Sequence, residues 1–263
     1  MLRLFAVLGL VLALPAAAQS PVRIAIIIDD LGNNQLLGRQ AVELPGPVTY
    51  SVLPQRPYSG DIAERAHLGG KEVMLHLPMQ ASDGRDLGPG GLHTDMSREE
   101  FARGVQQNLA AVPHVSGVNN HMGSLLTRDV QAMRWLMEDL RCSGDLYFVD
   151  SRTDVGTVAR QSAREAGLAN AQRDVFLDNE QDADYVREQL QRLIDKARRR
   201  GSAIGIGHPH PQTLDVLAEV LPQWAAQGIE LVPVSRLVEN QGSKRIWHAC
   251  SSPWPTVAKN SRL

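Results

Sequence analysis

The stretch VRIAIIIDDLG at residues 22–32 decides the fold, because it joins a buried strand to a polar turn. Its apolar run, 22–28, is rich in β-branched residues, which is typical of a strand covered on both faces. The strand delivers Asp29 and Asp30 to the turn that follows. If the pleat continues through this pair, the two carboxylates point in opposite directions and serve different roles.

Further apolar runs alternate with helical patterns along the chain. We predict additional strands at 48–53, 72–77, 115–118, 146–149, 202–207 and 228–234. The clearest helix is 183–200, where apolar residues recur on one face and Gly201 follows as the stop. Other helices are expected near 33–43, 59–69, 97–111, 128–141, 154–167 and 212–226. Alternation over 22–238 predicts one α/β domain, either a parallel (β/α) barrel or a doubly wound sheet.

Composition narrows the class of protein. The chain has 263 residues, 43% of them hydrophobic, and a net charge of −2, which is ordinary for a globular protein. The near-neutral charge argues against a nucleic-acid partner, since such proteins usually carry a basic stripe. Two cysteines, Cys142 and Cys250, are too few for a disulfide scaffold or a cysteine-based zinc module. They either pair in an oxidising compartment or remain free thiols.

The two ends of the chain differ from its centre. Arg3, the apolar run 4–14 and small residues up to Ala18 have the layout of a secretory signal peptide, 1–18, cleaved near Ala18. The run is shorter than the roughly 20 apolar residues of a spanning helix, so we expect export without a stable membrane span. At the other end, 239–263 lacks periodicity and is expected to be a poorly ordered tail.

Titratable side chains follow the carboxyl ends of the predicted strands. Those that we expect at this rim are Asp29, Asp30, His76, His121, Asp150 and His208. In parallel α/β folds these ends open on one face, and catalytic groups come from them. Taken singly, each residue has an ordinary explanation as a helix cap, a turn residue or a hydrogen-bonded histidine. Together, carboxylates and imidazoles are ligands that suit zinc or a similar divalent ion.

Five segments carry a family resemblance: AIIIDDLG, EVMLHLPM, GVNNHMGS, FVDSRTD and AIGIGHPH. Together they resemble the divergent polysaccharide deacetylase family, an exported bacterial branch of the NodB-type carbohydrate esterases, over about residues 22–238. The resemblance implies a single distorted (β/α) barrel of about seven parallel strands and a divalent metal such as Zn²⁺. It also implies a periplasmic hydrolase that removes N- or O-acetyl groups from a polysaccharide or from peptidoglycan.

The resemblance assigns the metal ligands residue by residue. Asp30 matches the family's metal-binding aspartate, and His76 falls on the first histidine of its H-x-x-x-H pair. Gln80 occupies the place of the second histidine. His121 is therefore expected to supply the third ligand.

The resemblance also assigns the catalytic groups. Asp29 matches the family's base, and His208 matches the histidine that acts as general acid. The arginine-containing substrate motif of the usual relatives is missing. Arg152 is a candidate to orient Asp29 in its place, and Asn120, Asp150 and Arg152 are the expected substrate-binding residues.

Two other functions compete with this prediction. A non-catalytic exported glycan- or protein-binding factor that retains the barrel is favoured by Gln80 and by the missing arginine. A metal-dependent phosphodiesterase on a similar barrel is more distant. It is disfavoured because we see no cluster of Arg or Lys at the strand ends to clamp a phosphate.

Overall fold

The computed structural model describes residues 21–238. The cleavage site near Ala18, the tail 239–263 and Cys250 lie outside the described residues. The expectations about them stay predictions.

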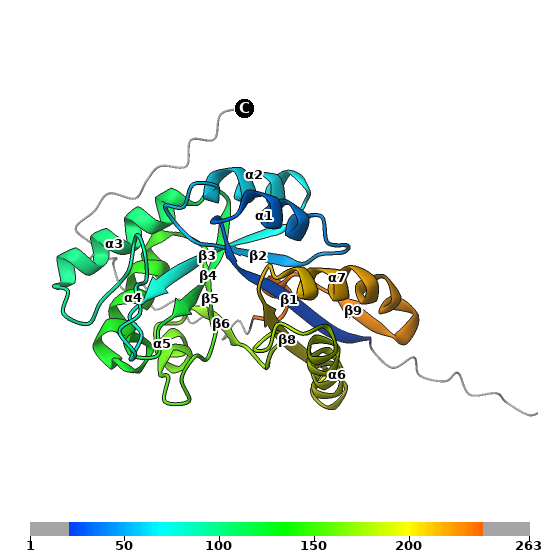
Figure 1. Ribbon diagram of the computed structural model, residues 1–263. Coiled ribbons are helices and arrows are strands. Elements are labelled where there is room, and N and C mark those ends of the chain that lie inside the picture. The colour runs from blue at the N-terminus through cyan, green and yellow to red at the C-terminus, as the bar shows by residue number, and fades with distance from the viewer. Residues whose placement is uncertain (1–20, 239–263) are drawn as a thin grey trace, which may run out of the picture.

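The strand β1 (Val22–Leu31), which carries the Asp pair, runs through the middle of the sheet and is drawn in blue in Figure 1. β8 (Ser202–Gly207) pairs along one side of it. On the other side, the start of β1 pairs with β9 (Ile229–Leu231) and its later part with β2 (Thr49–Val52). All these pairings are parallel, as the alternation of strands and helices predicts.

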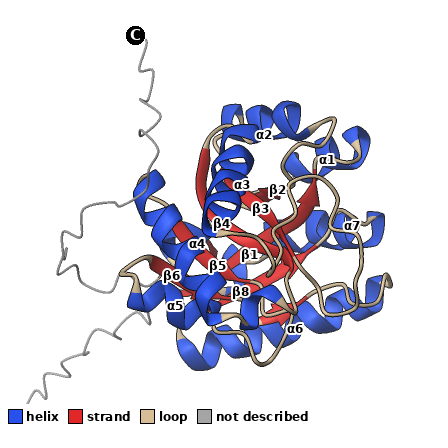
Figure 2. Cartoon of the chain, turned by 90° about the vertical axis from the view of Figure 1, so that its left-hand side faces the viewer, coloured by secondary structure: helices blue, strands red, loops and turns tan. Residues whose placement is uncertain are grey.

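The other strands extend this sheet in both directions. They are β3 (Glu72–Met79), β4 (Val115–Met122), β5 (Tyr147–Asp150), β6 (Ala169–Gln172) and β7 (Val175–Phe176). The strand order is β6-β5-β4-β3-β2-β1-β8-β7. Its two end strands, β6 and β7, are joined in the chain by Arg173 and Asp174 alone. Because so short a link must bridge the two ends of the sheet, the sheet curls into an incomplete barrel (Figure 2).

Helices surround the curled sheet on its outside (Figure 2). They are α1 (Gln35–Val42), α2 (Ser59–Leu68), α3 (Arg98–Ala111), α4 (Val130–Ser143), α5 (Ala159–Glu165), α6 (Ala183–Arg200) and α7 (Pro211–Val220). Within the described range, no helix has both the length and the apolar character needed to cross a bilayer.

Alternating strand side chains divide the core into two layers. One face of each strand packs against the helices, and the other fills the barrel interior. The interior cluster consists of Ala25, Ile27, Met74, Tyr147, Val149, Ala171, Ile204, Ile206 and Val234. Because the side-chain period is two, residues two positions beyond this cluster reach the mouth of the barrel.

The predicted (β/α) barrel is confirmed, with differences in detail. β6 and β7 were not predicted, because four and two residues are too few to show a period of two. The helix expected at 154–167 begins only at Ala159, since a loop precedes it. The helix expected at 212–226 ends at Val220, and short 3₁₀ turns continue the chain from Leu221 onward.

Candidate metal centre and active site

Polar side chains from four strands or their ends meet at the mouth of the barrel. Three of them lie two positions after a residue whose side chain fills the barrel interior, so they point to the same side of their strands. Asp29 follows Ile27 in this way on β1, and His76 follows Met74 on β3. His208 stands two positions beyond Ile206 of β8. β4 contributes Asn119 and His121.

Three of the expected ligands form a compact triangle. Asp30 Oδ1 lies 3.1 Å from His76 Nε2 and 2.8 Å from His121 Nδ1, and the two nitrogens are 3.2 Å apart. Ligand atoms about 2.0–2.1 Å from a tetrahedral zinc ion are themselves separated by about 3.3 Å. Asp30 Oδ1 is buried and accepts no well-directed hydrogen bond from the described residues. The spacing and this orphaned oxygen both fit a divalent cation.

A backbone irregularity turns Asp30 into the site. Its φ is 60°, in the left-handed region that few non-glycine residues adopt, and the pairing register shifts between Ile28 and Leu31. The expectation that Asp29 and Asp30 point in opposite directions is therefore wrong. Asp29 Oδ2 and Asp30 Oδ1 lie 3.7 and 3.1 Å from the same atom, His76 Nε2. The bulge cancels the pleat and brings both carboxylates to one imidazole.

Asn119 forms hydrogen bonds that fix the positions of His76 and Asp29, and the sequence analysis did not identify it. Its Oδ1 is 2.8 Å from His76 Nδ1 and also accepts a hydrogen bond from Ser51 Oγ at 2.6 Å. With Nδ1 as the donor, Nε2 of His76 is free to bind a cation. Asn119 Nδ2 donates to Asp29 Oδ1 at 2.8 Å. Counting back two positions from His121 along the strand would have identified Asn119.

Asp178 positions the imidazole of His208 through its Nδ1, as Asn119 positions that of His76. Asp178 Oδ1 is 3.0 Å from His208 Nδ1, and its Oδ2 accepts the backbone N–H of His208 and the Thr213 hydroxyl. Burial alone would lower the pKa of His208. The hydrogen bond and the charge of Asp178, with smaller contributions from Asp30 and Asp29, raise it to about 9. Asp178 follows β7, the short strand that the sequence did not reveal.

The two aspartates differ in their electrostatics. Burial raises the pKa of Asp29, and the nearby His76, His208 and Asn119 offset this only in part. Burial also acts on Asp30, but His121 and His76 outweigh it and lower its pKa. Asp30 therefore remains ionised while Asp29 binds a proton more readily. This is the division expected of a ligand and a base.

Gln80, in the place of the family's second histidine, lies outside this cluster. Its side-chain Oε1 accepts hydrogen bonds from the backbone N–H and the hydroxyl of Thr94, both at 2.9 Å. Its backbone N–H donates to Leu92. Gln80 thus closes the base of the loop 81–93.

Of the three expected substrate-binding residues, Asn120 and Asp150 support a loop, and Arg152 is exposed. Asn120 and Asp150 lie one position out of phase with the interior alternation, so both side chains turn into the loop after β5. The Asn120 side chain accepts a hydrogen bond from the backbone N–H of Ser151. The Asp150 carboxylate accepts hydrogen bonds from the backbone N–H of Arg152 and from the hydroxyl of Thr157. Arg152 is exposed, and its side chain makes no hydrogen bond or ion pair to any residue of 21–238, Asp29 included.

The expectation that no cationic residues gather at the strand ends is also wrong. Arg173 follows β6 on the inner face, two positions beyond Ala171, and donates to the backbone carbonyls of Ser151 and Arg152. The sequence hid this arginine because it hid the strand before it.

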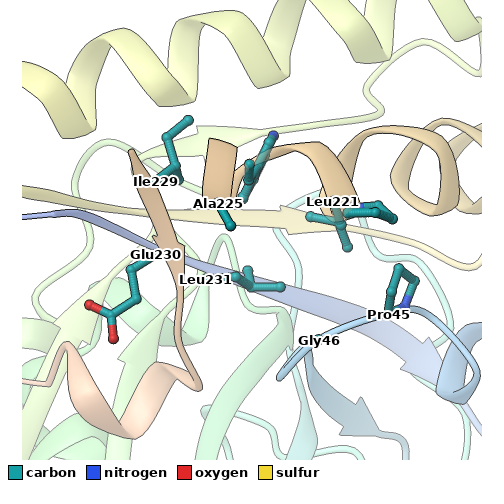
Figure 3. A pocket seen from close by; sticks show the side chains of 9 residues that line it. Pro45, Gly46, Leu221, Ala225, Ile229, Glu230 and Leu231 are labelled. Carbon is teal, nitrogen blue, oxygen red and sulfur yellow. The ribbon is translucent and has the colours of Figure 1, made fainter. Parts of the chain in front are cut away.

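An apolar hollow lies at the opposite end of the barrel (Figure 3). It has a volume of about 320 Å³ and is formed beside β9, which pairs with the start of β1. Its lining is Pro45, Gly46, Leu221, Pro222, Trp224, Ala225, Ile229, Glu230 and Leu231. Glu230 is the one ionisable side chain in this lining, so the hollow lacks the groups that the barrel mouth gathers.

The fold and the mouth of the barrel define the class of protein: a parallel (β/α) barrel with an Asp-His-His triad, spaced to hold a cation, at the carboxyl ends of its strands. Residues 26–238 match the divergent polysaccharide deacetylase family, and the chain belongs to this family.

The chain is also similar in sequence and in structure to individual proteins. The chain is 39% identical over 208 residues to the uncharacterized protein YibQ of Escherichia coli, a match that covers 78% of this chain and 65% of that protein. The chain thus spans just under two thirds of that relative. A crystal structure of the uncharacterized protein ATU2773 from Agrobacterium tumefaciens is 25% identical, with a TM-score of 0.80, and covers 85% of this chain and 92% of that one.

A more distant neighbour shares the fold alone. It is a mutant of BA3943, described as a CE4 family pseudoenzyme with restored enzymatic activity, whose wild type is from Bacillus anthracis. It is 14% identical, with a TM-score of 0.51 and coverage of 84% of this chain and 68% of that one.

Proposed function

We propose that the protein is an exported, metal-dependent hydrolase that removes acetyl groups from a polysaccharide of the cell envelope. The observation that carries the proposal is an acid and a base that each lie within 4 Å of one member of the same ligand set. His208 Nε2 lies 3.8 Å from Asp30 Oδ2, and Asp29 Oδ2 lies 3.7 Å from His76 Nε2. Family membership supports an acetylated glycan as the substrate.

The ligand set in this proposal is Asp30, His76 and His121. A divalent cation such as Zn²⁺ bound there would supply Lewis-acid activation of a water molecule and of the acetyl carbonyl. The unmet oxygen of Asp30 and the ligand spacing support this assignment.

The chain's own residues move the protons. Asp29 accepts one proton from the attacking water, and its raised pKa suits a base that must hold that proton. Asn119 keeps the Asp29 carboxylate in position through its Nδ2–H. His208, protonated because of Asp178, gives a proton to the departing sugar nitrogen or oxygen as the bond to the acetyl carbon breaks. Acetate and a free sugar amine or hydroxyl are the products.

The proposal is tested by acetate release from acetylated oligosaccharides and from peptidoglycan. Chelation should abolish release and added zinc should restore it. Asp29→Asn should lower the rate by about 10²–10⁴-fold, the usual value of a general base, while bound metal is unchanged. Asp61→Asn, an exposed position on α2, is the matched control. Release that survives both chelation and Asp29→Asn would overturn the proposal.

A second candidate is a non-catalytic glycan- or protein-binding factor that keeps the barrel. One observation favours it: no arginine side chain forms a hydrogen bond or ion pair with Asp29 in the described chain. Such a factor would bind glycan yet release no acetate from any substrate.

A further inference from the structure

We propose that Arg173 and Arg152 form a carboxylate-binding subsite at the mouth of the barrel. The glycan substrate would then carry a carboxylate close to the acetyl group that is removed. The second statement rests on the proposed function, whereas the subsite is a property of the chain itself.

Arg173 is held rigidly with part of its donor set unused. Its Nε donates to the carbonyl of Ser151 at 2.6 Å and its Nη2 to that of Arg152 at 2.8 Å. Its Cζ lies 5.1 Å from the centre of the Phe176 ring. Nη1 has no hydrogen-bond partner among residues 21–238. A planar guanidinium fixed in this way is preorganised to bind a carboxylate.

The charges of the two arginines are not neutralised within the described part of the chain. Neither Arg152 nor Arg173 forms an ion pair there, and the nearby Asp150 carboxylate is used by the Arg152 backbone N–H and by Thr157. Burial and the neighbouring charge of Arg152 lower the pKa of Arg173, and the charges of Asp150, Asp29 and Asp174 offset this only in part. An incoming anion would relieve the repulsion between the two cations.

The backbone at Arg152 supports a binding role. Its φ is 49°, a left-handed conformation that costs free energy in a residue with a side chain. This turn directs the Arg152 carbonyl to Arg173 and leaves the Arg152 side chain exposed. Strain of this kind is concentrated at functional sites.

The subsite lies close to the proposed general acid. Both groups lie near Phe176, whose ring centre is 5.1 Å from Arg173 Cζ and 5.1 Å from the His208 ring centre. Arg173 and His208 are therefore at most about 10 Å apart. One sugar unit with its substituents spans this distance, so the carboxylate belongs on the acetylated sugar or its neighbour.

The test is calorimetric binding of N-acetylmuramic acid, its methyl ester and N-acetylglucosamine. The protein should bind the acid about tenfold more tightly than either neutral sugar, as charge-assisted hydrogen bonds at a partly exposed rim allow. Arg173→Met should remove this preference. Arg152→Met should reduce it without affecting folding, since that side chain makes no hydrogen bond or ion pair within residues 21–238. Arg103→Met, an exposed arginine on α3, should retain it.

Equal binding of the acid and its ester by the wild type would overturn the subsite. Tighter binding of N-acetylglucosamine 6-phosphate than of the acid would also overturn its assignment to carboxylates. Acetate release is measured in parallel on acetylated oligosaccharides and on peptidoglycan. A retained acid preference without any acetate contradicts the proposed hydrolase alone, whereas acetate release without a preference contradicts the subsite alone.

Discussion

Two buried residues behind the barrel mouth, Asn119 and Asp178, control the side chains that the sequence identified. Each faces a histidine ring nitrogen and leaves the opposite nitrogen pointing into the site. Such supporting contacts fix the tautomer and the orientation of an imidazole. Both carry polar groups that are almost fully buried, so they contribute to folding as well as to the site.

At this scale we predict the titration of His208 in the metal-free protein. Its imidazole should titrate at about 9 by NMR, because Asp178 outweighs the effect of burial. Asp178→Asn removes the negative charge that contributes most to this shift and should lower the pKa of His208. A wild-type imidazole that titrates near 6.5 would contradict the Asp178 interaction.

The same shift gives a stability prediction with a definite sign. Because folding raises the pKa of His208, the protonated ring stabilises the native state fully below about 6.5. This contribution is lost as the pH rises through about 9. Urea unfolding of the wild type and of Asp178→Asn should therefore show a stability difference that shrinks between these pH values.

At the scale of elements, strand periodicity predicted the long strands and the residues that follow them. β1, β3 and β8 show apolar runs, and each places a candidate residue at the mouth. The pattern could not predict the bulge at Asp30, because a local φ leaves no periodic signal. It also missed β6 and β7, and with them Arg173 and Asp178.

β4 depends on a glycine two positions before Asn119. A methyl group at Gly117 would overlap the ring of the buried Tyr147 on β5, which has little room to move. Gly117→Ala should therefore lower the free energy of unfolding by about 1–3 kcal/mol, the usual cost of overpacking.

Denaturant unfolding measures this effect, with Gly60→Ala on α2 as its control. Gly60 has open space around its added methyl, so that variant should be neutral or slightly more stable. An equally stable Gly117→Ala protein would show that β4 and β5 are less closely packed than the structure describes.

For the whole molecule, the curl of the sheet brings together side chains that are far apart in the sequence. Asp30, His76 and His121 stand on three strands, and β1 and β3 are separated by β2 in the sheet order. The sequence predicted this gathering because parallel strands open their carboxyl ends on one face. It did not predict the degree of curl, which depends on the two-residue link between β6 and β7.

The central claim, that this triad holds one divalent cation, is tested most directly by metal content. The protein is loaded with zinc, dialysed and measured by atomic spectroscopy. The wild type and His114→Ala, a histidine outside the triad paired with Glu64, should each retain about one equivalent. His121→Ala should retain well below one, and unchanged stoichiometry in His121→Ala would contradict the account.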